Sequence, residues 1–104
     1  MAIESIEFTG SAARGEFVLS GMLTFSTASA ALKAAAPLFR EATSLRFDLS
    51  GVIRADSAGV GLLIEWLRMA RDSGCQLRYA HIPESLRAIM RVGGVEDMLP
   101  IERA

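Results

Sequence analysis

The chain has 104 residues, of which 51% are apolar and 22% are charged, and its formal net charge is −1. This length fits one compact domain over residues 1–104. The apolar content excludes a disordered chain, because enough surface can be buried to offset the entropy of ordering. A near-neutral chain without a basic run argues against nucleic acid as a partner.

The least charged stretch of the chain does not predict a membrane span. Residues 15–40 are nearly uncharged, but Glu16 and Lys33 interrupt them and Pro37 lies inside. The first seven residues lack the basic start of a signal peptide, and the one cysteine, Cys75, cannot form an intrachain disulfide. We expect a cytoplasmic protein without direct membrane insertion. A mean hydropathy of +0.33 hints that another molecule covers part of its surface.

The first segments read as two strands joined by a turn. Ile3, Ile6 and Phe8 lie among polar residues, and the small residues of 10–15 form a turn. Residues 17–21 follow as a second strand. The pair therefore resembles a hairpin.

An alanine-rich helix is expected next. Ser26 or Thr27 could cap a helix over residues 28–36, in which Leu32 is the main core anchor. Pro37 lacks an amide proton and crowds the preceding turn, so it predicts a kink or the end of this helix.

The middle of the chain predicts a strand followed by a long helix. Residues 45–50 alternate apolar with polar side chains, and Gly51 ends this strand. Residues 57–73 form the clearest helix, which Asp56 caps and Gly74 closes. The outward stripe of this helix consists of Gly61, Glu65, Arg68 and Asp72.

A further strand and helix complete the chain. Residues 76–81 read as a strand, and Pro83 opens a helix in which Leu86, Ile89 and Met90 share one face. The resulting order is β-β-α-β-α-β-α, with a short closing segment. This order predicts an α/β fold with a mixed central β-sheet and helices packed mainly on one face.

The sequence offers little for metal or cofactor chemistry. Its single His81 and single Cys75 cannot make a Cys/His metal site. Residues 10–15 have the glycine spacing of a phosphate loop, but Glu16 stands where that loop needs a lysine. We therefore expect neither a metal nor a cofactor.

The sequence allows three interpretations of Ser57. As a nucleophile on a strand-to-helix turn, Ser57 would need His81 as its base. The Gly-x-Ser-x-Gly motif of such turns is incomplete here, because Ala55 replaces its first glycine. As a helix cap it would have a structural role only. As a contact residue at a helix N-terminus it would suit a phosphate, which would place about two negative charges in any docked interface.

The glycines and aromatic residues around Ser57 predict a division between core and surface. Gly59 is expected to pack within the fold, whereas Gly61 lies on the outward stripe and is the better interface candidate. Trp66 and Phe47 fall on buried faces, and Cys75 is expected to be a small buried residue.

The tetrapeptide Asp56-Ser57-Ala58-Gly59, preceded by residues 47–52 and followed by an apolar helix, closely resembles the STAS domain. Residues 21–25 are similar to a second conserved stretch of this family. The resemblance implies a binding module and no catalytic residue. STAS domains form anti-sigma factor antagonists, transporter tails and a subunit of the Mla phospholipid-transport ABC complex.

Residues 51–68 and 94–101 look most like the Mla subunit, often called MlaB. Antagonists usually carry an apolar pair where this chain has Arg54-Ala55. The similarity implies a cytoplasmic subunit, held at the inner membrane by the transporter, that binds the Mla ATPase and through it the permease. It would support the phospholipid transport that maintains outer-membrane lipid asymmetry. The alternative is an antagonist whose Ser57 is phosphorylated by an anti-sigma kinase.

On this interpretation the partner contacts the loop 52–56 and the exposed start of the following helix. Small residues at a helix start allow close approach, and charged residues at the rim set the register. Glu65 and Arg68 could alternatively pair with each other, since they are three residues apart. The predicted contact residues are Val52, Arg54, Asp56, Ser57, Ala58, Gly61, Glu65 and Arg68.

Overall fold

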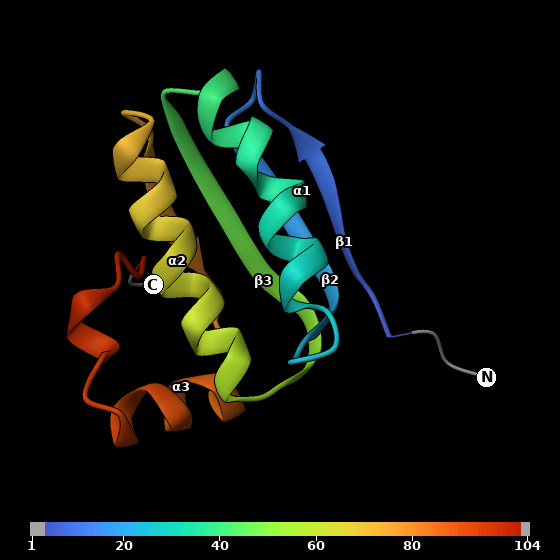
Figure 1. Ribbon diagram of the computed structural model, residues 1–104, viewed down its shortest axis with the longest axis vertical. Helices are drawn as coiled ribbons and strands as arrows, with labels where there is room; N and C mark the ends of the chain where they lie inside the picture. The colour runs from blue at the N-terminus through green and yellow to red at the C-terminus, as the bar shows by residue number, and fades with distance from the viewer. Residues whose placement is uncertain (1–3, 103–104) are drawn as a thin grey trace.

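The structure is a computed structural model that describes residues 4–102. Its elements follow the predicted order of two strands and then alternating helices and strands (Figure 1). Ile3, expected to begin the first strand, lies outside the described residues. The elements are β1 (Ile6–Ser11), β2 (Glu16–Leu23), α1 (Ala28–Glu41), β3 (Ser44–Ala55), α2 (Ser57–Asp72), β4 (Gln76–Ala80), α3 (Glu84–Val92) and the 3₁₀ helix η1 (Glu96–Met98).

The four strands form one mixed sheet in the order β1-β2-β3-β4. The first two strands pair antiparallel, as the predicted hairpin requires, while β2 with β3 and β3 with β4 pair parallel. Each parallel connection carries a helix, as a parallel crossover requires. The carboxyl ends of β2 and β3 therefore lie at the same edge of the sheet, beside the starts of α1 and α2 (Figure 1).

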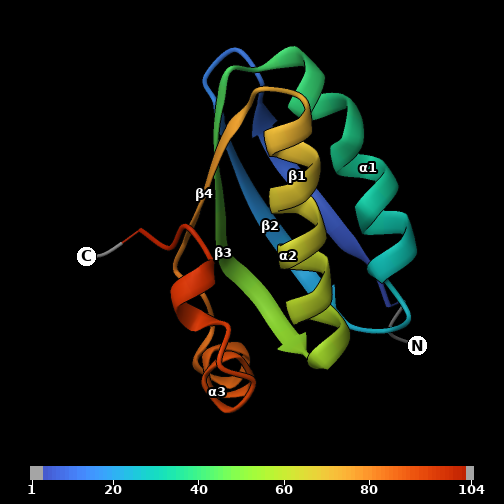
Figure 2. The ribbon, with the colours of Figure 1, turned by 60° about the vertical axis from the view of Figure 1, so that its left-hand side comes forward.

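The two long helices cover the same face of the sheet, as Figure 2 shows. The shorter α3 packs near the start of α2, at the end of the molecule where the parallel strands finish. The predicted α/β fold, with a mixed sheet and helices mainly on one face, is confirmed. Within residues 4–102, none of the helices is both long and apolar enough to cross a membrane.

An aromatic cluster lies between the sheet and the helices. The ring of Phe47 packs 5.3 Å from that of Trp66 and 5.7 Å from that of Phe8, both edge to face. Tyr79 joins the cluster, and its hydroxyl donates a 2.7 Å hydrogen bond to the carbonyl of Leu63. These rings bury a large apolar area, and their edge-to-face geometry adds further stabilisation. The predicted core positions of Trp66 and Phe47 are confirmed, as is the burial of Cys75.

Helix α1 differs from the prediction at two points. It continues through Pro37 to Glu41, because Phe39 beyond the proline is fully buried and holds the last turn on the sheet. The carbonyl that loses its hydrogen bond is that of Lys33, an exposed residue, so water can replace the missing amide. The predicted anchor Leu32 is only partly buried. The buried residues of α1 are Ala31, Ala35 and Phe39.

Strand β3 is longer than predicted and carries two irregularities. It runs past Gly51 to Ala55, so the expected loop over residues 52–56 is mostly strand. Against β2, its pairing shifts once between Val18 and Ser20 and again between Gly21 and Met22. Each shift places one extra residue on β3, as in a β-bulge. Bulges break the alternation of inward and outward side chains, which is why simple alternation ended the strand too early.

Candidate functional site

The junction between β3 and α2 is the feature that the sequence singled out. Asp56 caps α2, as predicted: its Oδ1 accepts a 2.9 Å hydrogen bond from the backbone N–H of Ala58. Ser57 is the first helical residue, and its side chain is exposed. Because Asp56 fills the capping position, capping does not account for Ser57.

The second prediction for this junction concerned the two glycines of α2. A Cβ placed on Gly59 would lie 2.7 Å from the carbonyl oxygen of Leu23, so only glycine lets α2 approach the end of β2 this closely. A Cβ on Gly61 would meet nothing within 4 Å. Gly59 therefore serves packing within the fold, and Gly61 leaves an open spot on the surface, as predicted.

The eight predicted contact residues divide by exposure. Val52 is only 7% exposed and belongs to the core cluster. Its assignment to the surface was wrong, because the bulges turn its side chain inward. Arg54, Ser57, Gly61 and Arg68 are exposed, and Asp56, Ala58 and Glu65 are partly buried.

Two exposed apolar side chains at this end of the molecule were missed. Ile53 is 81% exposed and is the extra residue of the second bulge in β3. Phe25, in the segment between β2 and α1, is 85% exposed. Its backbone N–H donates to Asp56 Oδ2 at 3.1 Å, which places it beside the start of α2. A lone phenylalanine among the small polar residues after β2 was the available signal for an exposed aromatic side chain.

A groove separates the first turns of α1 and α2. Its volume is about 270 Å³. The groove begins beside Gly61, where the missing side chain leaves it open. It is lined by Ala28, Ser29, Leu32, Gly61, Leu62 and Glu65. We call the groove together with Phe25, Ile53, Arg54 and Ser57 the docking surface.

The charged side chains on the outward stripe of α2 pair with one another. Arg68 hydrogen-bonds to Glu65 and forms a 2.8 Å ion pair with Asp72. The hydrogen bond from Arg68 lowers the pKa of Glu65 below its usual value, and the same bond raises the pKa of Arg68. The predicted pairing of Glu65 with Arg68 is confirmed. Because these side chains are exposed, the pairs contribute little to stability.

No hydrolase geometry surrounds Ser57. Within residues 4–102, no hydrogen bond joins Ser57 to His81, whose Nδ1 lies 3.0 Å from Asp48 Oδ1. The interpretation of Ser57 as a nucleophile therefore has no base in place. The described part of the chain also holds no group of three or more His, Cys, Asp or Glu residues suited to a metal ion.

The helix-free face of the sheet carries an ion-pair network that the sequence did not reveal. Arg46 pairs with Glu16 at 2.9 Å and with Glu102 at 2.8 Å. Arg78 also reaches Glu102, at 3.2 Å. The hydrogen bond from Arg46 lowers the pKa of the Glu102 carboxyl. The network ties the C-terminal segment to the sheet and contains none of the predicted contact residues.

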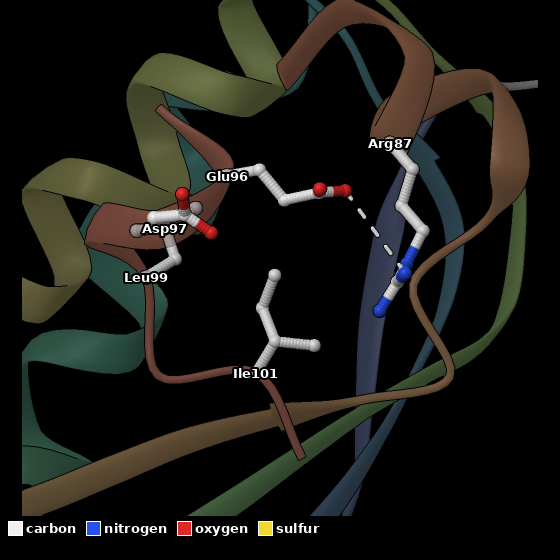
Figure 3. A pocket seen from close by; sticks show the side chains of 5 residues that line it. All are labelled: Arg87, Glu96, Asp97, Leu99 and Ile101. Carbon is white, nitrogen blue, oxygen red and sulfur yellow. Dashed lines mark ion pairs between the residues drawn. The ribbon is translucent and has the colours of Figure 1, made fainter. Parts of the chain in front are cut away.

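A second hollow, of about 280 Å³, lies between α3, η1 and the C-terminal segment. Figure 3 shows Arg87 and Glu96 pointing toward each other across it. The guanidinium of Arg87 lies 4.0 Å from Glu96 Oε2, and that of Arg91 lies 3.6 Å from the same oxygen. Glu96 Oε2 is shared by the two arginines but accepts no hydrogen bond within residues 4–102, and Asp97 also lines the hollow.

Comparison with known families gives the class of this protein. The family described as "Mlab, STAS domain" matches residues 6–100. The chain therefore belongs to the STAS-domain family, as its sequence motif predicted. STAS domains mediate protein–protein interactions and are generally non-catalytic. No curated protein matches the chain.

Solved structures agree on the fold. An anti-sigma factor antagonist from Mycobacterium paratuberculosis superposes with a TM-score of 0.75 at 20% identity, over 99% of this chain and 90% of that one. The anti-sigma factor antagonist SpoIIAA in its unphosphorylated form superposes with a TM-score of 0.66 at 14% identity, over 95% of this chain and 88% of that one. The structure of SLC26A9 superposes with a TM-score of 0.62 at 16% identity, over 81% of this chain and 17% of that one. At these identities the likeness shows the fold alone.

Proposed function

We propose that this chain is a non-catalytic subunit that binds the cytoplasmic ATPase of an Mla-type ABC transporter. Through the ATPase and its permease it supports phospholipid transport that maintains outer-membrane lipid asymmetry. The observation that carries the proposal is the match of the Mlab branch of STAS domains over residues 6–100. The chain would be located in the cytoplasm, held at the inner membrane by the transporter.

The docking surface supports a protein partner. Phe25 and Ile53 expose almost their whole side chains at one end of the molecule. Burying each of them would contribute about 1.5–3 kcal/mol. Large aromatic side chains that fill a partner's pocket are typical of interface hot spots.

The groove is of a size that a side chain of the partner can fill. Its volume of about 270 Å³ falls just below the range of about 300–1,000 Å³ that is common for ligand pockets. Gly61 at its mouth permits close backbone approach. Arg54, near the end of β3, is an exposed charge that can set the register of the partner.

A second candidate function is an anti-sigma factor antagonist. Two of the similar structures are SpoIIAA in its unphosphorylated and phosphorylated forms. Ser57 is exposed at the start of α2, where a phosphate would be accessible and would add negative charge to the docking surface. In that case the partner would be an anti-sigma kinase.

Affinity capture separates the two functions. The tagged chain is expressed in its native cell, and the membrane extract is purified and analysed by mass spectrometry. We expect an ABC-transporter ATPase together with its permease. Recovery of a histidine-kinase-like anti-sigma factor, without transporter subunits, would replace the transport proposal with the antagonist.

A further inference from the structure

The carboxylate of Asp56 joins two segments that are distant in the sequence. Its Oδ1 accepts from the N–H of Ala58 at 2.9 Å, and its Oδ2 accepts from the N–H of Phe25 at 3.1 Å. Its own N–H donates to the carbonyl of Leu23 at 3.2 Å. One residue thus fixes the start of α2 and the segment that follows β2.

The segment around Phe25 is also held from its other side. The buried Thr27 hydroxyl donates to the carbonyl of Met22 at 2.7 Å and accepts from the N–H of Thr24 at 3.0 Å. Between these two attachments Phe25 stays 85% exposed. The backbone is therefore fixed on both sides of Phe25, although the side chain of Phe25 is hardly packed against the rest of the protein.

We propose that Asp56 is a positioning residue that holds Phe25 ready as the anchor of the docking surface. Binding is strengthened when the backbone that carries a contact side chain is ordered before the partner arrives, because less conformational entropy is then lost. Asp56 itself is partly buried, and both of its carboxylate oxygens already accept backbone hydrogen bonds. This role differs from the direct contact predicted for Asp56 from the sequence, and it rests on the docking surface of the proposed function.

Two substitutions separate the capping bond from the bond to Phe25. Serine caps helices about as well as aspartate, so Asp56→Ser keeps the bond to Ala58 but has no second oxygen for the N–H of Phe25. Asp56→Ala loses both bonds. In water-exchange NMR of the labelled full chain, both variants should speed exchange of the Phe25 amide about tenfold or more. If the Phe25 amide exchanges at the wild-type rate in both variants, the positioning role is overturned. This result requires no partner protein.

Binding to the captured, purified ATPase completes the test through a double-mutant cycle. Phe25→Ala should weaken binding about tenfold, and Asp56→Ser about threefold to tenfold. If Asp56 acts through Phe25, adding Asp56→Ser to Phe25→Ala should cause no further loss. An equal loss in both backgrounds would show direct contact by Asp56 and overturn the inference, as would wild-type binding by Phe25→Ala.

The inference and the proposed function can fail separately. If the capture recovers an anti-sigma kinase, the transport proposal fails, and the same cycle is measured with that kinase. If the ATPase is recovered but the cycle is additive, the transport proposal stands and the positioning role fails.

Discussion

Gly59 and Gly61 are two residues apart on α2, yet the structure predicts opposite effects when each is changed to alanine. At Gly59 the added methyl group would lie 2.7 Å from the carbonyl oxygen of Leu23 and 3.2 Å from its Cβ. Backbone cannot move aside as a flexible side chain does. Such overpacking costs about 1–3 kcal/mol. The cost exceeds the gain in helix propensity, which is small in the first turn of a helix.

At Gly61 the same methyl group meets nothing within 4 Å. Alanine is favoured over glycine inside a helix by about 0.5–1 kcal/mol. Gly61→Ala should therefore stabilise the fold by that amount, and Gly59→Ala should destabilise it by about 1–2 kcal/mol. The two variants should differ in free energy of unfolding by about 2 kcal/mol.

Urea unfolding followed by tryptophan fluorescence measures this difference, since Trp66 is the only tryptophan and is fully buried. With a slope of about 1–2 kcal/mol per molar urea, the two midpoints should lie about 1–2 M apart. The melting temperatures should separate in the same order, by about 4–8 °C per kcal/mol. If Gly59→Ala is as stable as the wild type, or if Gly61→Ala is less stable, the assignment of the two glycines is refuted.

Other expectations follow from α1, the core and the exposed phenylalanine. Pro37→Ala should restore the hydrogen bond to Lys33 and stabilise the fold by about 1–2 kcal/mol, net of the added entropy of the unfolded chain; an unchanged urea midpoint would contradict it. Burial raises the pKa of the Tyr79 hydroxyl well above its usual value of 10.0. The protonated hydroxyl therefore contributes fully to stability below pH 10, and this contribution is lost as the pH rises toward the folded-state pKa. Urea midpoints at pH 8 to 11 should therefore fall less steeply for Tyr79→Phe than for the wild type, and parallel curves would count against this role. Phe25→Ser should change the free energy of unfolding by less than about 0.5 kcal/mol, as expected for an exposed residue, and a larger loss of stability would show that Phe25 serves the fold.

Local patterns were sufficient to predict most of the fold. The order of the elements, the capping of α2 by Asp56 and the burial of Trp66 could be predicted because each rests on short-range periodicity or on capping. Cys75 was placed correctly in the core for the same reason. The sequence also carried enough of the strand–serine–helix motif to identify the family.

The features that were missed depend on contacts between distant residues. The extra residues of β3 are visible only against β2, so the sequence could not show that Val52 is buried while Ile53 is exposed. Helix α1 continues past Pro37 because Phe39 is buried against the sheet, which helix propensity alone does not include. The hydrogen bond between Phe25 and Asp56 joins residues 31 positions apart and has no local signature.

We propose above that the docking surface at the start of α2 binds a transporter ATPase. The most direct test of this proposal is quantitative affinity capture with wild type, Ser57→Arg and Ser73→Arg side by side. Both serines are exposed and lie at opposite ends of α2, so Ser73→Arg controls for the added charge and bulk. We expect wild type and Ser73→Arg to recover the ATPase equally, whereas Ser57→Arg should recover about tenfold less. Its free energy of unfolding should fall by no more than about 1 kcal/mol, the cost of a positive charge at a helix N-terminus. Equal recovery by all three chains, or loss with Ser73→Arg alone, would contradict the proposal.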